Sequence, residues 1–168
     1  HEYEDIMQVT GVHVAYLAKA MTAKLLSRME KNNKRAALVF VGSGLGARPV
    51  PGVTVYSACK SFGSFLTSAL SVEFSGKVDC MHYEVGEMST KMRRAPPGGM
   101  IITPEKASAA CLRDIGIETH TNGSFIHEMS TTMMNGLPLG AMQSLMNFVS
   151  VKALKKRREE ETNTNKRD

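Results

Sequence analysis

The chain has 168 residues, 42% of them hydrophobic, which is enough to bury one core. Its net charge of +5 is concentrated in residues 152–168, where seven Lys/Arg outnumber four Asp/Glu. That segment has no aromatic side chains to stack on bases and contains three consecutive Glu, which argues against a nucleic-acid groove. Cys59, Cys80 and Cys111 are widely spaced and have no His partners at metal-ligand spacing, which argues against a disulfide framework and against a metal site.

The first predicted elements are a helix and a strand. Apolar side chains recur at helical spacing at Val14, Leu17, Ala18, Met21, Leu25 and Met29. Residues 36–41 form a short apolar run of β-forming residues that ends at a Gly/Ser cluster. This run is typical of a fully buried strand of a parallel sheet. Ser43 therefore comes just after the carboxyl end of a predicted strand.

A second predicted helix follows, and Tyr56 and Lys60 lie at its start. Its apolar positions are Ala58, Phe62, Phe65, Leu66, Ala69 and Leu70. Residues four apart share a helix face, so Tyr56 and Lys60 are neighbours on successive turns. The Tyr56–Lys60 spacing alone is weak evidence for a site, because two surface side chains have the same spacing by chance in many helices. The position next to a strand's carboxyl end is more specific, since ligand crevices of open α/β sheets lie there.

These three polar side chains predict a reductase site. A phenol has a pKa near ~10, and an ammonium group one helical turn away favours the phenolate, so Lys60 would tune Tyr56 for proton transfer. The Ser43 hydroxyl would hydrogen-bond a substrate carbonyl while hydride arrives from a nicotinamide. The predicted chemistry is carbonyl reduction or the reverse oxidation.

The later segments predict structure rather than chemistry. Residues 78–81 form a strand-like run, and Thr103-Pro104-Glu105 predicts a helix start with Thr at the cap. Thr121-Asn122-Gly123 predicts a turn before a strand, with His127 as a hydrogen-bonded residue at a strand end. Residues 137–154 are moderately apolar and interrupted by polar side chains, which favours a helix at a membrane surface over a membrane span.

The chain resembles the short-chain dehydrogenase/reductase superfamily, whose catalytic Ser, Tyr and Lys match Ser43, Tyr56 and Lys60 in order and spacing. The resemblance implies an α/β fold, namely a Rossmann-type doubly wound parallel sheet. It also implies that Tyr56 and Lys60 contact the nicotinamide ribose. In this superfamily the helix that bears Tyr and Lys and the helix before it commonly form the dimer interface, so we expect a homo-oligomer.

The resemblance extends to residues 85–90, Val-Gly-Glu-Met-Ser-Thr. They are similar to the superfamily's Pro-Gly-x-x-x-Thr segment, which touches the nicotinamide side of the cofactor. Gly86 and Thr90 are therefore expected to bind cofactor. Val85 departs from the pattern, and the turn loses the fixed φ of a proline without losing the Thr hydroxyl.

Within the superfamily the chain is most similar to microsomal very-long-chain 3-oxoacyl-CoA reductases, a group that includes 17β-hydroxysteroid dehydrogenase-like members. The similarity lies in residues 42–51, 103–105, 121–127 and 135–138. It implies NADPH as cofactor, with NADH not excluded, and reduction of a 3-oxoacyl-CoA in fatty acid elongation at the endoplasmic reticulum membrane. A hydroxysteroid or retinoid dehydrogenase is the alternative on the same machinery. Without the resemblance, a cytoplasmic location would be expected.

Two family features are missing from the sequence. The superfamily places an Asn near the start of the helix before the Ser-bearing strand, and here only Gln8 and His13 are candidates for that position. The Gly-rich turn that would meet a dinucleotide pyrophosphate is also missing, so the expected sheet is partial and lacks its N-terminal dinucleotide-binding strands. We expect a fragment of a longer protein. The competing expectation is a short, non-catalytic remnant that acts through its dimer-forming helices.

The expected organisation has three parts. Residues 5–128 form the C-terminal half of a Rossmann unit. Residues 129–151 form a helical extension that contacts a membrane surface. Residues 152–168 form a charged flexible tail.

Overall fold

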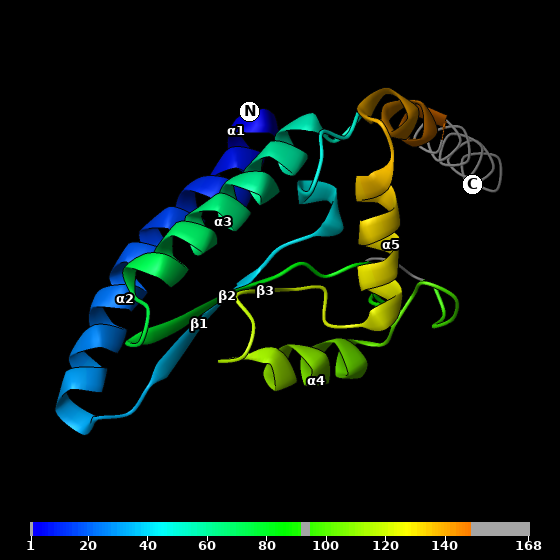
Figure 1. Cartoon of the computed structure of the whole chain (residues 1–168). Coiled ribbons are helices and arrows are strands. Elements are labelled where there is room, and N and C mark those ends of the chain that lie inside the picture. The colour runs from blue at the N-terminus through cyan, green and yellow to red at the C-terminus, as the bar shows by residue number, and fades with distance from the viewer. Residues whose placement is uncertain (1, 92–94, 149–168) are drawn as a thin grey trace, which may run out of the picture.

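The computed structural model describes residues 2–91 and 95–148, which form an α/β fold around one small parallel sheet (Figure 1). The strands are β1 (Ala36–Val41), β2 (Val78–Tyr83) and β3 (His120–Thr121), in the order β1-β2-β3. β1 pairs with β2 from Ala36↔Val78 to Val41↔Tyr83, and β3 pairs with β2 only at its end. The predicted parallel α/β sheet is confirmed.

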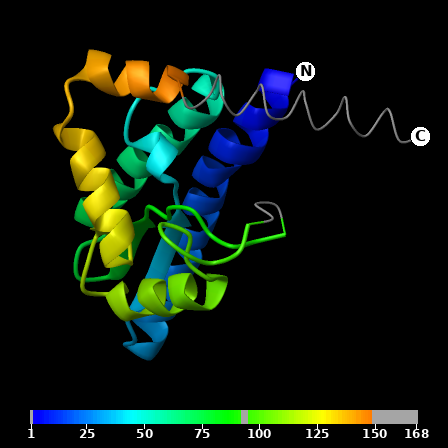
Figure 2. The ribbon, with the colours of Figure 1, turned by 90° about the vertical axis from the view of Figure 1, so that its right-hand side faces the viewer.

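Helices cover both faces of this sheet (Figure 1, Figure 2). α2 and α3 lie side by side on one face, and α4 lies on the other, while α5 follows β3. The helical elements are α1 (Glu2–Met7), the π-helix η1 (Gln8–Val12), α2 (His13–Asn32), the 3-10 helix η2 (Gly44–Gly46), α3 (Thr54–Glu73), α4 (Pro104–Asp114) and α5 (Phe125–Gly136). The helix predicted around Tyr56 and Lys60 is thus confirmed as α3.

Side-chain caps set the starts of the two later helices. The Thr103 hydroxyl accepts from the Lys106 N–H at 3.3 Å and Pro104 opens α4, as the sequence predicts. The prediction of a strand after residues 121–123 is wrong, because the Ser124 hydroxyl accepts from the His127 N–H at 3.3 Å and caps α5 instead. His127 therefore lies inside a helix, after a strand of only two residues.

The burial of β1 also differs from the prediction. Phe40, 9% exposed, is the one buried residue of this strand, and Val41 is 60% exposed. Within the described residues β1 pairs with β2 on one edge and has no strand on the other. The central strand is instead β2, whose Met81 and Tyr83 form the apolar core with Ala107 of α4. The described residues therefore show a partial sheet, as expected.

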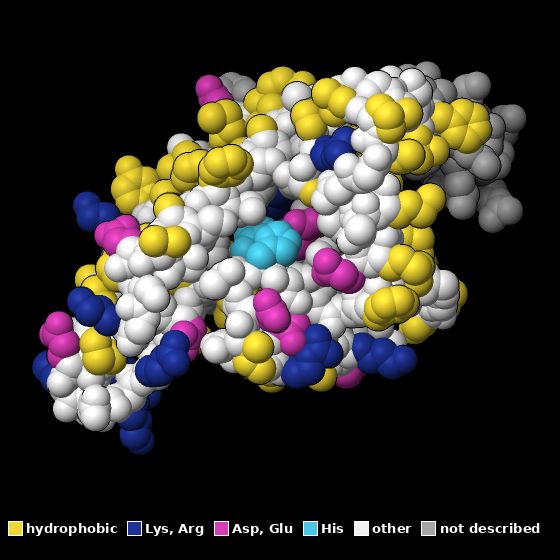
Figure 3. Space-filling model, viewed as in Figure 1, with side chains coloured by type: hydrophobic (Ala, Val, Ile, Leu, Met, Phe, Trp, Pro, Cys, Tyr) yellow, Lys and Arg dark blue, Asp and Glu magenta, His cyan; other side chains and the backbone are white. Residues whose placement is uncertain are grey.

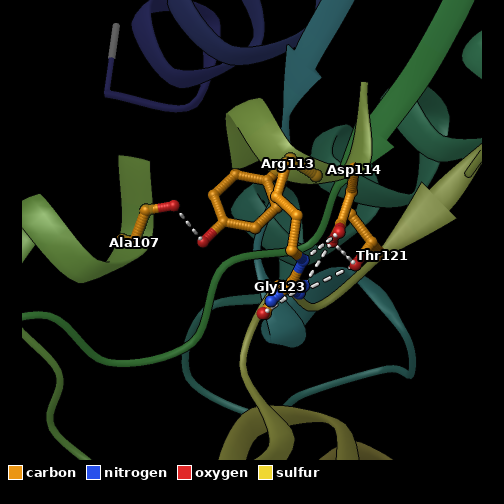
Figure 4. A network of polar contacts seen from close by, with 6 residues as sticks. Ala107, Arg113, Asp114, Thr121 and Gly123 are labelled. Carbon is orange, nitrogen blue, oxygen red and sulfur yellow. Dashed lines mark hydrogen bonds and ion pairs between the residues drawn. The ribbon is translucent and has the colours of Figure 1, made fainter. Parts of the chain in front are cut away.

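A polar network fastens β3 to α4 (Figure 4). Asp114 is buried and accepts from Arg113 at 2.6 and 2.9 Å and from the Thr121 hydroxyl at 2.7 Å. Arg113 also donates to the Gly123 carbonyl at 2.9 Å. The hydrogen bond from Arg113 is the main reason that the pKa of Asp114 lies below its usual value. This network sets the position of the short strand that carries His120.

The C-terminal part of the chain is described only in part. Residues 139–148 are helical, whereas residues 149–151 of the expected helical extension and the expected tail, 152–168, lie outside the described residues. None of the helices in the described ranges combines the length and the apolar character that crossing a membrane requires.

Candidate active site

Ser43 lies at the turn that leaves β1. Its backbone is extended, and its hydroxyl accepts from the Leu45 N–H at 3.3 Å, which caps η2. The Gly42 N–H donates to the Tyr83 carbonyl at 2.8 Å and the Gly44 N–H to the Val85 carbonyl at 3.3 Å. The pairing of β1 with the following strand thus continues past the strand ends and holds Ser43 at the carboxyl edge of the sheet, as predicted.

Tyr56 and Lys60 lie on the first turns of α3 and face the same edge. The Lys60 ammonium donates to the Val41 carbonyl at 3.1 Å and lies 5.6 Å from the centre of the Tyr56 ring. Burial lowers the pKa of Lys60 below its usual value. The site thus places a partly desolvated cation beside a phenol, where its field acts through little water.

The turn after β1 is fixed to α3 by serine hydroxyls. Ser57 donates to the Leu45 carbonyl at 2.6 Å and to the Arg48 carbonyl at 2.9 Å, and Ser61 donates to the Gly46 carbonyl. Each serine immediately follows Tyr56 or Lys60 in the sequence. The helix face next to the two predicted catalytic side chains therefore holds the loop that carries Ser43.

Two open cavities lie around the end of β1. The first, about 700 Å³ and here called the Tyr56 cavity, is lined by α2, β1 and α3 and contains Tyr56, Lys60 and His82. The second, about 320 Å³ and here called the Ser43 cavity, contains Ser43 and Gly86. The structure thus brings the phenol and the ammonium together in one cavity and places the serine hydroxyl in the other.

The structure distinguishes Gln8 from His13, the two candidates for the position of the family's Asn. His13 lines the Tyr56 cavity, whereas Gln8 is absent from its lining. The two residues are connected, since His13 Nδ1 lies 3.2 Å from the Gln8 carbonyl oxygen across the π-helix. A π-helical turn inside a helix is common at functional sites. Of the two, His13 is the side chain that faces the predicted proton donor.

Gly86 and Thr90 differ in their positions. Gly86 lines the Ser43 cavity, and a Cβ there would lie 2.5 Å from Cδ2 of His127, so this close approach requires glycine whether or not a cofactor binds. His127 Nε2 lies 3.0 Å from the Met100 carbonyl oxygen. Thr90 belongs to the lining of neither cavity.

Three groups of functional interest were not singled out from the sequence. Arg48 donates to the Leu137 carbonyl at 2.9 Å and to the Asn135 side chain at 3.3 Å, which ties the Ser43 loop to the end of α5. His82 of β2 and Glu84, which follows that strand directly, are buried beneath the same loop. In the sequence, the feature that could have pointed to His82 and Glu84 was the presence of two ionisable residues in and just after a predicted strand.

Comparison with known proteins identifies the family of this chain. The model of the short chain dehydrogenase family matches residues 2–97. The very-long-chain 3-oxoacyl-CoA reductase of Homo sapiens is 28% identical over 137 residues, which are 79% of this chain and 43% of that protein. The very-long-chain 3-oxoacyl-CoA reductase-A of Danio rerio is 34% identical over 111 residues, which are 64% of this chain and 34% of that protein. This chain thus spans less than half the length of these curated relatives.

Solved structures share the fold. A 7beta-hydroxysteroid dehydrogenase superposes with a TM-score of 0.61 at 22% identity, over 72% of this chain and 50% of that one. A short chain dehydrogenase from Burkholderia cenocepacia, solved in complex with NADP, gives 0.56 at 18% identity, over 77% and 57% of the two chains. Together with the family match over more than half of the sequence, these findings show that the chain belongs to the short-chain dehydrogenase family.

Proposed function

We propose that this chain carries the proton-transfer site of an NADPH-dependent 3-oxoacyl-CoA reductase of fatty acid elongation, as part of a longer protein. The main support is the arrangement of Lys60, 5.6 Å from the Tyr56 ring and bonded to the last carbonyl of β1, inside a cavity at the carboxyl edge of the sheet. The similarity to very-long-chain 3-oxoacyl-CoA reductases of several organisms supports the substrate class.

The donors of the Tyr56 cavity fit a nicotinamide nucleotide, because a phenol and an ammonium can hydrogen-bond the ribose hydroxyls. Tyr56 and Lys60 would hold that ribose, and Gly86 and Thr90 would lie near the nicotinamide. When bound, NADPH supplies hydride to the carbonyl carbon. NADH remains the alternative cofactor.

The residues of the chain then handle the proton. Tyr56 donates its phenolic proton to the carbonyl oxygen as hydride reaches the carbon, so the ketone becomes an alcohol and Tyr56 a phenolate. Lys60 stabilises that phenolate electrostatically. Ser43 donates a hydrogen bond to the same oxygen and holds it in place. The substrate carbonyl would sit at the end of β1, where the Tyr56 and Ser43 cavities approach each other.

The Ser43 cavity has the character expected for an acyl chain. Four methionines contribute to its lining, at Met100, Met134, Met142 and Met146. Methionine is unbranched and polarisable, so such a wall adapts to flexible apolar ligands. A hydroxysteroid or retinoid substrate uses the same features, and turnover of each substrate class separates the two possibilities. The resemblance to microsomal reductases supports the proposal that the reaction takes place at the endoplasmic reticulum membrane.

A second candidate function is association through α2 and α3. Phe65 and Val72 of α3 and Tyr16 of α2 are each more than 70% exposed, although they are large and apolar. An apolar surface of this kind is typical of an interface. It suits a homo-oligomer of the enzyme and equally a non-catalytic remnant that pairs with a longer relative.

The test of the catalytic proposal is Tyr56→Phe in the natural full-length protein. Removal of the phenolic proton should lower kcat for a 3-oxoacyl-CoA by about 10²–10⁴-fold, with NADPH affinity almost unchanged. Tyr16→Phe is the matched control, since that phenol is 72% exposed and outside both cavities. Turnover by Tyr56→Phe at the wild-type rate would overturn the proposal.

A further inference from the structure

The Gly42–Gly44 turn, which carries Ser43, packs against His82 of β2, and Glu84, which follows that strand directly, lies nearby. A Cβ at Gly42 would lie 2.2 Å from Nε2 of His82, so the imidazole occupies the space that any other residue at position 42 would need. A Cβ at Gly44 would lie 3.9 Å from the Glu84 carboxylate. Both side chains are buried, with exposures of 3% and 4%.

The cluster extends to β3. His82 and His120 are register partners, and their rings stack with centres 5.4 Å apart and planes at 29°. His120 Nε2 lies 3.2 Å from the Glu84 carboxylate, and its side chain is 44% exposed. On the molecular surface, histidine emerges in a hollow between α3 and the α4–α5 side, with acidic side chains around it (Figure 3). A row of titratable groups therefore runs beneath α3, from solvent to the Tyr56 cavity.

Several charges act on the buried imidazole. Burial, helped by His120 of β3 and Lys60 of α3, lowers the pKa of His82 to about 4, against the opposing effect of Glu84 just after β2. His13 of α2 lines the same cavity. The hydrogen bond to Glu84 raises the pKa of His120. At neutral pH His82 is therefore uncharged, whereas the contact with Glu84 favours the charged form of His120.

Two buried polar atoms of this cluster have no hydrogen-bond partner among the described residues, namely His82 Nδ1 and one Glu84 carboxylate oxygen. Unsatisfied buried groups of this kind are costly and rarely retained without a role. His82 lines the same cavity as Lys60, and its Nε2 fills the space beside Gly42. A positive charge on this imidazole would be repelled by the Lys60 ammonium. The contact surface of the turn is thus sensitive to protonation.

We propose that His82 is a positioning residue for Ser43: the neutral imidazole holds the Gly42–Gly44 turn in place, and protonation of that imidazole displaces the turn and the serine hydroxyl with it. The structural part of this proposal concerns the folded chain alone. Its effect on turnover rests on the proposed reductase function.

The first experiment follows the imidazoles and the turn together by NMR, in the 168-residue chain, from pH 7.5 downwards. His82 should remain neutral through pH 6, and the amide shifts of Gly42, Ser43 and Gly44 should move with the His82 ring. His82→Asn assigns the ring signal and should abolish the coupled shift of the turn. Turn amides that stay still while His82 titrates, or a His82 ring that titrates near pH 6.5, would overturn the proposal.

The second experiment is a double-mutant cycle that needs no titration. Gly42→Ala should lower the melting temperature in the wild-type background, whereas the same change in a His82→Ala background should cost much less, because the competing ring is gone. Gly63→Ala is the control, since a Cβ there meets nothing within 4 Å. An equal loss from Gly42→Ala in both backgrounds would show that His82 does not seat the turn.

The third measurement uses turnover of the natural full-length protein. His82→Asn should reduce kcat more than it changes KM or NADPH affinity, because its effect passes through the Ser43 hydroxyl, whose hydrogen bond to the carbonyl oxygen strengthens as charge develops there. Absence of turnover in the wild type would count against the proposed function alone, since the NMR and melting experiments still decide the role of His82. A His82→Asn enzyme with wild-type kcat, despite a displaced turn, would overturn the link to Ser43.

Discussion

The two faces of β2 use burial in different ways. On the face towards α4, Met81 and Tyr83 pack in an apolar core with Val85 and Ala107. On the face towards α2 and α3, His82 and Glu84 are as deeply buried but are ionisable. Successive side chains of a strand point to opposite faces, so one strand serves both purposes. The α4 face therefore holds the apolar core, whereas the α3 face lies against the candidate site.

Among the changes that test the two faces, Lys60→Ala on the α3 face is expected to have the largest effect, and that effect is on kcat. Loss of the ammonium removes the charge beside Tyr56 and the bond to the Val41 carbonyl, so kcat should fall by about 10²–10⁴-fold. The melting temperature should change little, because a single partly exposed lysine contributes little to packing. Steady-state kinetics and thermal melting of the same preparation measure both quantities. A variant that melts early and keeps its activity would place Lys60 among the structural residues.

Met81→Ala on the α4 face is expected to lower the stability of the fold, which Lys60→Ala should leave almost unchanged. Met81 is 1% exposed and lies at the centre of the core, so the truncation should cost about 2–5 kcal/mol of unfolding free energy. Urea denaturation measures the loss. Met133→Ala is the control, since Met133 of α5 is largely exposed and should be close to neutral. A small loss at Met81 would mean that the two faces do not divide their roles as described.

Asp114→Ala should produce an intermediate effect and a pH signature. The buried carboxylate accepts from Arg113 and Thr121, and its removal should cost about 1–3 kcal/mol. The pKa of Asp114 is lowered in the folded state, mainly by Arg113, so its contribution is present above the unfolded pKa near ~3.9 and is lost as pH falls through the folded value. The stability gap between wild type and variant should therefore be constant from pH 5 to 7 and shrink below pH 4. Urea titrations at several pH values measure it, and a gap that grows in acid would contradict this account.

Local sequence signals were sufficient for much of the fold. The run 36–41 is β1 residue for residue, and the Thr-Pro-Glu sequence at 103–105 marks the start of α4, because strands and caps of this kind depend on a few adjacent residues. The strand predicted after Gly123 was wrong, since nothing in that short apolar run separates strand from helix before the Ser124 cap is recognised. Burial of β1 was overestimated, because burial depends on neighbouring strands and not on the run itself.

The site was predictable as far as it is local. Tyr56 and Lys60 share one helix, so their proximity follows from spacing alone. The cavity that each side chain lines depends on how α3 crosses the sheet. Tyr56 lines one cavity and Ser43 lines the other. The contact of His82 with His120 depends on strand register, which sequence periodicity leaves open when a strand is only two residues long. The cluster of His82, Glu84 and His120 could therefore not be predicted, because it depends on the register between strands that are distant in sequence.

The smallest effect on stability is expected from Phe65→Ser, which tests whether the outer face of α3 has a role of its own. The side chain is 81% exposed, so its removal should change the unfolding free energy by no more than about 0.5 kcal/mol. If α2 and α3 form a contact between copies, the same change removes an apolar anchor from that contact and should raise the dimer dissociation constant at least tenfold. Sedimentation velocity over a concentration series measures it, with the polar exchange Ser68→Thr on the same helix as control. A chain that is monomeric at all concentrations, with and without Phe65, would limit the role of α3 to its inner face, where it holds Tyr56, Lys60 and the turn of Ser43.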